Sequence, residues 1–232
     1  MNLFKHRQFK KDIITWGVRW YCSYGVSYRE LEAMMAERGA CVDHTTIYRW
    51  VIFYAPKLSV KIKKYWKPKY GGTWQVDETS IKVKGKCKWL YRAVTKKGET
   101  VDFYLSEEQN AKSAEEFFRK SIKGLQAFEI PKTINTDQHK AYPKAISTLK
   151  DEGKLPKYLE HRRVKFLNNR IESDHGKLKR LIKPTMGFKA MHSARATIAG
   201  FELMRMFKKG QFKGVRTVQE EIALIKRSLS SY

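Results

Sequence analysis

The sequence is short of cysteines and has no long apolar run, and both shortages exclude classes of protein. Its three cysteines, Cys22, Cys41 and Cys87, stand far apart and form no C-x-x-C pair, so a zinc ribbon or finger is not expected. We expect buried free thiols in a reducing compartment. No apolar stretch approaches the ~18 residues of a membrane span, and the polar, basic start has no signal-peptide pattern. These absences favour a cytoplasmic protein without a membrane partner.

Acidic residues are scarce as well. The chain has 48 lysines and arginines against 23 acids, a formal charge of +25 over 232 residues. The basic residues are spread along the whole chain, so we expect a polyanionic partner, nucleic acid before all others. A membrane surface is the rival partner, and a basic ribosomal component is the alternative class. The length allows one large domain or a small and a medium one, with 42% hydrophobic residues to build a core.

Residues 10–56 carry the pattern of three short helices. The spacing in the first predicts an apolar face made of Ile13, Trp16, Trp20 and Tyr24. The second opens at Ser27 with the S-x-x-E spacing of a capping box and is expected to end at Gly39. Its inner face is then Leu31, Met34 and Met35. Helix, short turn, helix is the layout of a helix-turn-helix unit.

The third helix of this region is the candidate DNA-reading element. Asp43 can cap its start, and Pro56 is expected to mark its end. Its inner face would be Ile47, Trp50, Val51 and Tyr54. Its outer face would hold His44, Thr45, Thr46, Tyr48 and Arg49. Short donors, an aromatic ring and an arginine suit base edges and phosphates, although an ordinary three-helix bundle with a polar face is the alternative.

A basic segment, residues 57–72, follows and changes into a pattern of strands. Its lysines interleave with aromatic residues, so it could track a phosphate backbone or be a solvated linker. Strands are predicted over 74–83, 89–94 and 101–105, and a helix capped by Ser113 runs to about 123. A strand at 131–137, a helix at 141–150, a weak strand at 157–161 and a helix at 168–183 come next. Further helices are expected from about 193 and over 218–226. The order β-β-β-α-β-α-β-α predicts a mixed sheet covered by helices.

The helix at 168–183 combines an apolar and a polar stripe. The apolar stripe is Leu167, Ile171, Leu178 and Ile182. The polar stripe is Asn168, Glu172, His175 and Lys179. Asp174 falls on the other side and is expected to be solvated. By itself this is a common amphipathic helix, and Lys179 with Arg180 could be DNA contacts or a solvated basic face.

Two aspartates upstream give Glu172 a possible role. Asp77 lies inside a predicted strand and Asp137 ends another, and carboxylates placed in this way can converge on divalent cations. Two such ions can activate a hydroxyl and stabilise the leaving oxygen in phosphoryl transfer. Glu78 could replace Asp77, but neighbours on a strand point to opposite faces, so we expect only one of them to serve. Three acids among 23 are a weak signal without further context.

The spacing and the surrounding motifs supply that context. Asp137 and Glu172 are 35 positions apart (172 − 137), and Lys179 lies seven beyond the glutamate. With WQVDETSIKVKGK, INTDQHKAYPKAI and RIESDHGKLKRLIKPTMGFKAMHSARATIAGFELM, nearly the whole chain resembles the DDE transposases of the bacterial insertion-sequence six (IS-six) family. This resemblance implies an α/β, RNase H-like mixed five-stranded sheet with flanking helices, preceded by an all-α helix-turn-helix domain. It implies that Asp77, Asp137 and Glu172 are catalytic metal ligands for Mg²⁺, with Mn²⁺ as a substitute, and that Lys179 contacts terminal DNA.

The same resemblance implies an activity and a division of the chain. The activity is cleavage and transfer of DNA strands at terminal inverted repeats, with double-stranded DNA ends and target as partners and cointegrates as product. A homodimer or higher oligomer on the bacterial nucleoid is expected. The expected domains are 1–56 helix-turn-helix, 57–72 linker, 73–210 catalytic and 211–232 helical tail. A non-catalytic helix-turn-helix regulator is the alternative, and a nuclease of the same fold would share the three acids.

Overall fold

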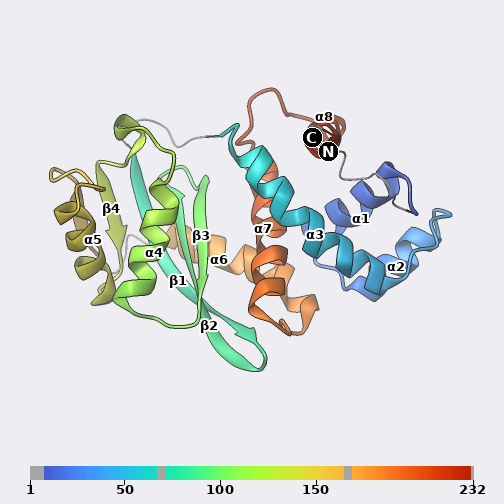
Figure 1. Cartoon of the computed structure of the whole chain (residues 1–232), viewed down its shortest axis with the longest axis horizontal. Coiled ribbons are helices and arrows are strands. Elements are labelled where there is room, and N and C mark those ends of the chain that lie inside the picture. The colour runs from blue at the N-terminus through green and yellow to red at the C-terminus, as the bar shows by residue number, and fades with distance from the viewer. Residues whose placement is uncertain (1–7, 67–71, 165–168, 231–232) are drawn as a thin grey trace. The chain divides into compact units, whose positions relative to one another are not determined.

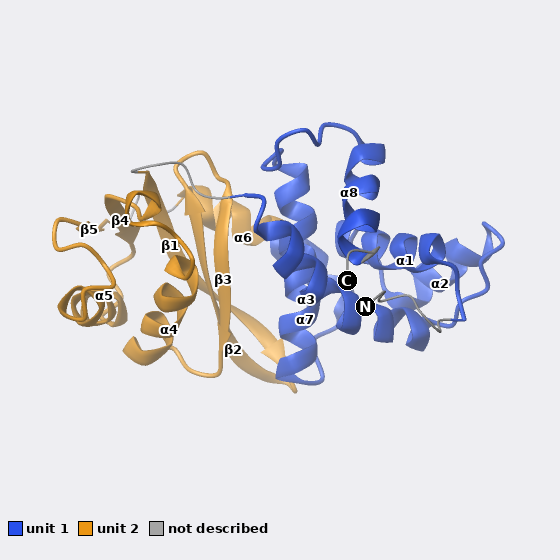
Figure 2. Cartoon of the chain, turned by 45° about the horizontal axis from the view of Figure 1, so that its top comes forward, with its two compact units in different colours: residues 1–66, 178–232 blue, residues 67–177 orange. Residues whose placement is uncertain are grey.

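The computed structural model describes residues 8–66, 72–164 and 169–230. The chain forms two compact units (Figure 2): residues 1–66 with 178–232, and residues 67–177. The first unit therefore combines the two ends of the sequence. The expected division into four consecutive domains stays a prediction. Among the described residues, no helix is both long and apolar enough to cross a bilayer.

The second unit is built on one mixed five-stranded sheet with the order β3-β2-β1-β4-β5 (Figure 1). Its strands are β1 Thr73–Val83, β2 Lys86–Thr95, β3 Thr100–Ser106, β4 Thr133–Thr136 and β5 Glu160–Arg163. β1, β2 and β3 form an antiparallel meander, while β4 pairs parallel to β1 and β5 parallel to β4. The expected fold class, an RNase H-like mixed sheet with flanking helices after a helical region, is confirmed. The last strand starts three residues later than predicted.

The turn between β1 and β2 shows why the meander closes where it does. Lys84 and Gly85 both have positive φ, 49° and 73°. Two successive residues with positive φ form the tight turn whose twist matches that of the paired strands. Glycine adopts a positive φ without steric cost.

Three helices cover the sheet: α4 Ala111–Ile122, α5 Ala141–Asp151 and α6 Asn169–Ile182, of which residues 169–177 belong to this unit (Figure 1). α4 begins earlier than predicted, because Asn110 rather than Ser113 caps it: the Asn110 side chain accepts a bond from the Ser113 N–H at 2.8 Å. Ser113 is instead buried against Ser106. The prediction failed because either residue has a capping side chain and only packing decides between them.

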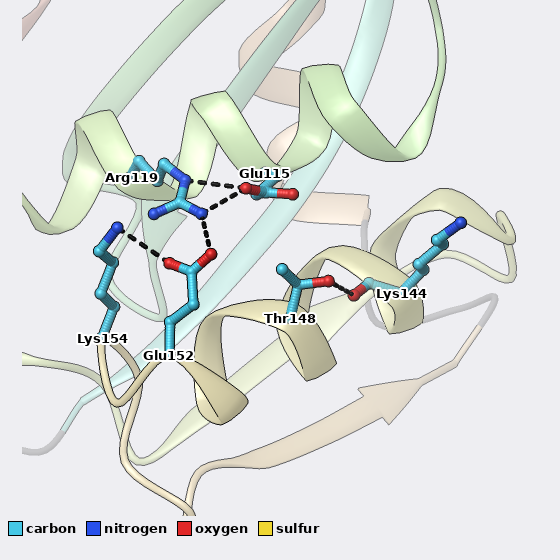
Figure 3. Close-up of polar contacts among 6 residues, drawn as sticks. All are labelled: Glu115, Arg119, Lys144, Thr148, Glu152 and Lys154. Carbon is cyan, nitrogen blue, oxygen red and sulfur yellow. Dashed lines mark hydrogen bonds and ion pairs between the residues drawn. The ribbon is translucent and has the colours of Figure 1, made fainter.

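Ion pairs hold α4 and α5 together at their exposed edge (Figure 3). Arg119 of α4 pairs with Glu115 one turn earlier and with Glu152 after α5, at 2.5 Å for the second pair. Lys154 adds a contact to Glu152 at 2.9 Å. The pKa of Glu152 is lowered to about 2, first by the hydrogen bond from Arg119. The network fixes the pair of helices that cover one face of the sheet.

The first unit is all-helical. It contains α1 Lys11–Ser23, α2 Tyr28–Ala36, α3 His44–Lys63, α7 Met191–Lys208 and α8 Val218–Ser230. The caps of α2 and α3 are as predicted: Ser27 forms a capping box with Glu30, and the Asp43 carboxylate accepts a bond from the Thr45 N–H. The inner face predicted for α3, Ile47, Trp50, Val51 and Tyr54, is buried.

Three predictions about the helices and the thiols are wrong. Pro56 does not end α3, because burial of Leu58 and Ile62 beyond it outweighs the lost backbone bond, so residues 57–63 continue the helix. The buried side of α1 is Ile14, Val18, Tyr21 and Cys22, whereas the predicted face is partly or fully exposed. Cys41 and Cys87 are exposed, and only Cys22 is a buried thiol.

α7 forms the core of the first unit, with most of its side chains buried. Its burial explains its apolar face without an interface to a second chain. Gly200 allows this packing: a Cβ there would clash with the Cys22 Sγ of α1 and lie 2.9 Å from the Ala55 Cβ of α3.

Candidate active site

Two neighbouring parallel strands place two of the predicted acids side by side. β1 and β4 pair in parallel with Gln75 opposite Asn135. Two residues further on, Asp77 and Asp137 occupy equivalent positions, and β4 has just ended at Thr136. The end of β4 leaves the flank of β1 open there. Carboxylate oxygens of Asp77, Glu78 and Asp137 all lie within 4.8 Å of one another.

Glu78 reaches the same cluster, contrary to the expectation that only one of the adjacent acids could. β1 is regular here: Asp77 and Glu78 lie opposite Arg92 and Tyr91 of β2, so successive side chains still start from opposite faces of the sheet. Because β4 has ended on the other side of β1, the longer glutamate can bring its carboxylate to that open edge. Gln109 donates to its Oε1 at 2.6 Å, and the buried Tyr142 hydroxyl donates to its Oε2.

Glu172 approaches on α6, from the opposite face of the sheet to α4 and α5. Arg92 of β2 and Asp174 of α6 form a buried ion pair at 2.5 Å. The Nδ1 of His175 lies 3.7 Å from the Oδ2 of Asp77. These contacts turn one side of α6 onto the sheet and leave Glu172 exposed. The expectation that Asp174 is solvated is wrong, because the sheet supplies an arginine at that position.

The stripes predicted on α6 are recovered in part. Ile171 and Leu178 are buried, Ile182 is half-buried, and His175 is buried while Glu172 is not. Leu167 and Asn168 lie outside the described residues.

Burial and neighbouring negative charges change the protonation of Asp77. The pKa of Asp77 is raised from 3.8 to about 7, first by burial and then by the charges of Glu78, Asp137 and Glu172. The backbone N–H of Glu78 opposes the shift. The pKa of Tyr142 is raised well above its ordinary value by burial and the Glu78 charge, so this hydroxyl stays a hydrogen-bond donor.

The donor set fits a hard divalent cation. It consists of carboxylate oxygens from separate elements, which are the ligands that Mg²⁺ and similar ions prefer. A cation would also relieve the repulsion that raises the pKa of Asp77. Glu172 is outside the group whose oxygens lie within 4.8 Å of one another, although its charge acts on Asp77.

The residues predicted to contact DNA lie on two helices of the first unit. On α3, Thr45, Tyr48 and Arg49 are exposed, and Thr46 is half-buried. The His44 Nδ1 lies 2.9 Å from the Glu32 carboxylate of α2. Lys179 and Arg180 are exposed in the last turns of α6. Their contact with DNA stays a prediction.

Sequence reasoning missed the residues that support the acids. Gln109, Tyr142 and Arg92 come from three different elements, and nothing in their local sequence indicates that they converge. The sequence indicated Glu78 only as an alternative to its neighbour Asp77. Only the end of β4 next to it, a tertiary feature, brings it into the cluster.

Comparison with known proteins agrees with this geometry. A family model described as a DDE domain, of the IS240 transposase type, matches residues 71–211. The transposase of the insertion sequence-like element IS431mec of Staphylococcus aureus (strain Mu50 / ATCC 700699) is 38% identical over 212 residues, 91% of each chain. The transposase of element IS257 in transposon Tn4003 of Staphylococcus aureus is 37% identical over the same length.

Solved structures resemble the chain more distantly. The catalytic core domain of HTLV-2 integrase in complex with magnesium is 17% identical, with a TM-score of 0.43 over 58% of this chain and 86% of that one. The simian T-cell lymphotropic virus intasome with a regulatory subunit of PP2A is 16% identical, with a TM-score of 0.46 over 80% of this chain and 65% of that one.

The matched domain and the acid cluster on the mixed sheet define the class: the protein is a DDE transposase, a polynucleotidyl transferase. Within that class, the chain belongs to the IS-six family of insertion-sequence transposases.

Proposed function

We propose that Asp77, Asp137 and Glu172 together hold divalent cations, Mg²⁺ with Mn²⁺ as a substitute, for cleavage and transfer of DNA strands at the ends of an insertion sequence. The single observation that carries this proposal is the meeting of Asp77 and Asp137 at the open end of β4. The effect of the Glu172 charge on Asp77 supports the third ligand. Bound there, the cations supply the charge that activates an attacking hydroxyl and stabilises the leaving oxygen.

The chain's own residues prepare this site. With a pKa of about 7, Asp77 is partly protonated near neutral pH, and binding of a cation would release that proton to solvent. Gln109 and Tyr142 occupy both oxygens of Glu78, so we assign Glu78 to positioning and to the charge of the site rather than to the ligand set. The Arg92–Asp174 pair fixes the rotation of α6 and with it the direction of Glu172.

We further propose that the first unit binds double-stranded DNA, at the terminal inverted repeats and at the target. The outer residues of α3, from His44 to Arg49, would enter the major groove, and Lys179 and Arg180 would contact the end of the element. The formal charge of +25 supports a DNA partner. Joining two ends of the element to a target requires at least a dimer of the protein. We expect this dimer or higher oligomer to act on DNA in the bacterial cytoplasm and to produce a cointegrate.

The test is a strand-transfer assay with labelled element-end DNA, a target plasmid and Mg²⁺. Asp137→Asn should abolish joined products while still shifting end DNA in a gel, because the amide keeps the shape and loses the charge. Asp151→Asn, at the exposed end of α5, is the matched control and should join ends as the parent does. Parental transfer by Asp137→Asn would refute the assigned site. If α3 reads the DNA, Arg49→Ala should lose binding to the element ends. It should retain strand transfer at high DNA concentration.

A further inference from the structure

A cavity of about 480 Å³ in the first unit is not used by the proposed chemistry. It lies where α2 and α3 begin and is closed by the segment from Pro184 to Ser193, which leads into α7. Its volume falls in the range of about 300–1,000 Å³ that is typical of small-ligand sites. All of its lining residues belong to the same compact unit.

Aromatic rings form the wall of the cavity. Tyr21 and Tyr28 stack with ring centroids 3.9 Å apart and planes 7° from parallel. Tyr48 meets Tyr28 edge-on at 5.6 Å, and Phe188 completes the wall. Tyr21 is 2% exposed and stacks on Tyr28 and Phe201, whereas Tyr48 is 38% exposed, so a ligand would reach the wall at Tyr48. Flat, pre-packed rings of this kind suit a planar ligand.

The rim of the cavity is positive. Arg29 and Lys189 are exposed side chains that line it, and no aspartate or glutamate occurs among its described lining residues. α7 starts at the rim and its first turn has no side-chain cap, whereas the carboxylates of Glu30 and Asp43 already cap α2 and α3. Helix starts carry partial positive charge and favour anions. The site therefore joins a planar apolar wall to an anion-binding rim.

We propose that this cavity binds one unpaired nucleotide of a DNA strand, with its base against the tyrosine wall and its phosphate beside Arg29 and Lys189. Base stacking on aromatic rings is sequence-tolerant, since every base has a π face. The buried hydroxyl of Ser193 also lines the cavity; it donates to the Ala190 carbonyl, which leaves its oxygen to accept from the edge of the base. The cavity also includes His44, Thr45 and Tyr48, so it is continuous with the face of α3 that we assign to duplex DNA.

This inference rests on the proposed binding of DNA and adds the state of the DNA that is bound. An unpaired nucleotide held in the cavity would stabilise a local opening of the duplex, at the cost of unstacking one base. Alanine substitution of a stacking group typically changes affinity by about tenfold or more per base. We therefore expect duplex DNA with one unpaired nucleotide to bind about tenfold more tightly than the fully paired duplex of equal length.

The first experiment maps contact by photocross-linking of the full chain to duplexes that carry a single unpaired 5-iodouracil. Cross-links should map to Tyr28, Tyr48 or Phe188. Cross-links confined to residues outside the cavity, with duplex binding intact, would overturn the inference. Cross-linking of the cavity to free 5-iodo-deoxyuridine monophosphate but never to DNA would assign it to a small nucleotide instead and would also overturn it.

The second experiment compares affinities for the two duplexes by fluorescence anisotropy. Tyr48→Ala should lose the tenfold preference, Tyr48→Phe should keep it, and Lys189→Ala should reduce it. Tyr158→Ala is the matched control, since this tyrosine is 69% exposed and does not line the cavity, and it should keep the preference. If the wild-type chain binds both duplexes equally, the proposed role of the cavity is refuted, while the proposed binding of duplex DNA stands. A chain that binds neither duplex refutes the proposed DNA binding and this inference with it.

Discussion

Asp77 carries a proton at a pH at which an ordinary aspartate has lost it. Its pKa is about 7 instead of 3.8, because burial and three neighbouring carboxylates oppose its charge. Between these two values the folded chain holds a proton that the unfolded chain has released. The free energy of unfolding of the metal-free protein should therefore fall as pH rises through this window, by the linkage of proton binding to stability.

Asp77→Asn should remove that part of the pH dependence. Each pKa unit corresponds to about 1.4 kcal/mol, so the difference between variant and parent should grow by a few kcal/mol from low to neutral pH. Denaturant unfolding in EDTA at pH 4.5 and pH 7.5 measures it. Asp151→Asn, whose carboxylate is exposed, should leave the slope unchanged. If the free energies of unfolding of Asp77→Asn and of the parent differ by the same amount at both pH values, the raised pKa of Asp77 is contradicted.

At the scale of elements, one ion pair decides how α6 meets the sheet. Arg92 is 1% exposed and Asp174 is 6% exposed, so each charge depends on its partner. Removing one partner leaves a buried charge and typically costs about 3–5 kcal/mol, whereas removing both is tolerated far better. The pair thus links the stability of the second unit to the direction of Glu172.

Asp174→Asn should lower the free energy of unfolding by about 3 kcal/mol, for the buried-charge reason just given. The double variant Arg92→Met with Asp174→Leu should recover most of that loss. Thermal and denaturant unfolding of the two variants beside the parent provides the comparison. Equal destabilisation of the single and double variants would mean that the pair does not act as a unit.

Helix packing in the first unit depends on one missing side chain. Gly200→Ala should destabilise the protein by about 1–3 kcal/mol, because the added methyl meets Cys22 and Ala55 where α1, α3 and α7 approach each other. Gly176→Ala is the matched control: this helical glycine on α6 has no atom within 4 Å of its added Cβ. It should stabilise by up to about 1 kcal/mol through helix propensity. Equal effects of the two substitutions would contradict the close packing.

Local chemistry determined which parts of the fold could be predicted. The capping box at Ser27, the short strand next to Asp137 and the meander after residue 73 depend on neighbours in sequence, and each was predicted, the short strand with bounds of 131–137 instead of Thr133–Thr136. The start of α4 was decided between two nearby capping residues by packing, and the length of α3 beyond Pro56 and the burial of Asp174 depend on partners far along the chain. Periodicity cannot show those partners, so these predictions failed.

The same distinction applies to the whole molecule. Residues 1–66 pack with residues 178–232, and this pairing of the two ends of the chain has no signature in the order of helices and strands. The matched DDE domain, residues 71–211, extends beyond the sheet unit and includes α7. For the active site, the resemblance indicated the three acids, whereas the bonds of Gln109 and Tyr142 to Glu78 and the Arg92–Asp174 pair needed the structure.

The central claim is that Asp77, Asp137 and Glu172 form one cation site. The most direct measurement is a titration with Mn²⁺, followed by electron paramagnetic resonance, on the parent and on Asp77→Asn, Asp137→Asn and Glu172→Gln at pH 7.5. We predict saturable binding by the parent, at least tenfold weaker binding by each variant, and competition by Mg²⁺. Binding that is unchanged in all three variants, or no binding by the parent with end DNA present, would contradict the account.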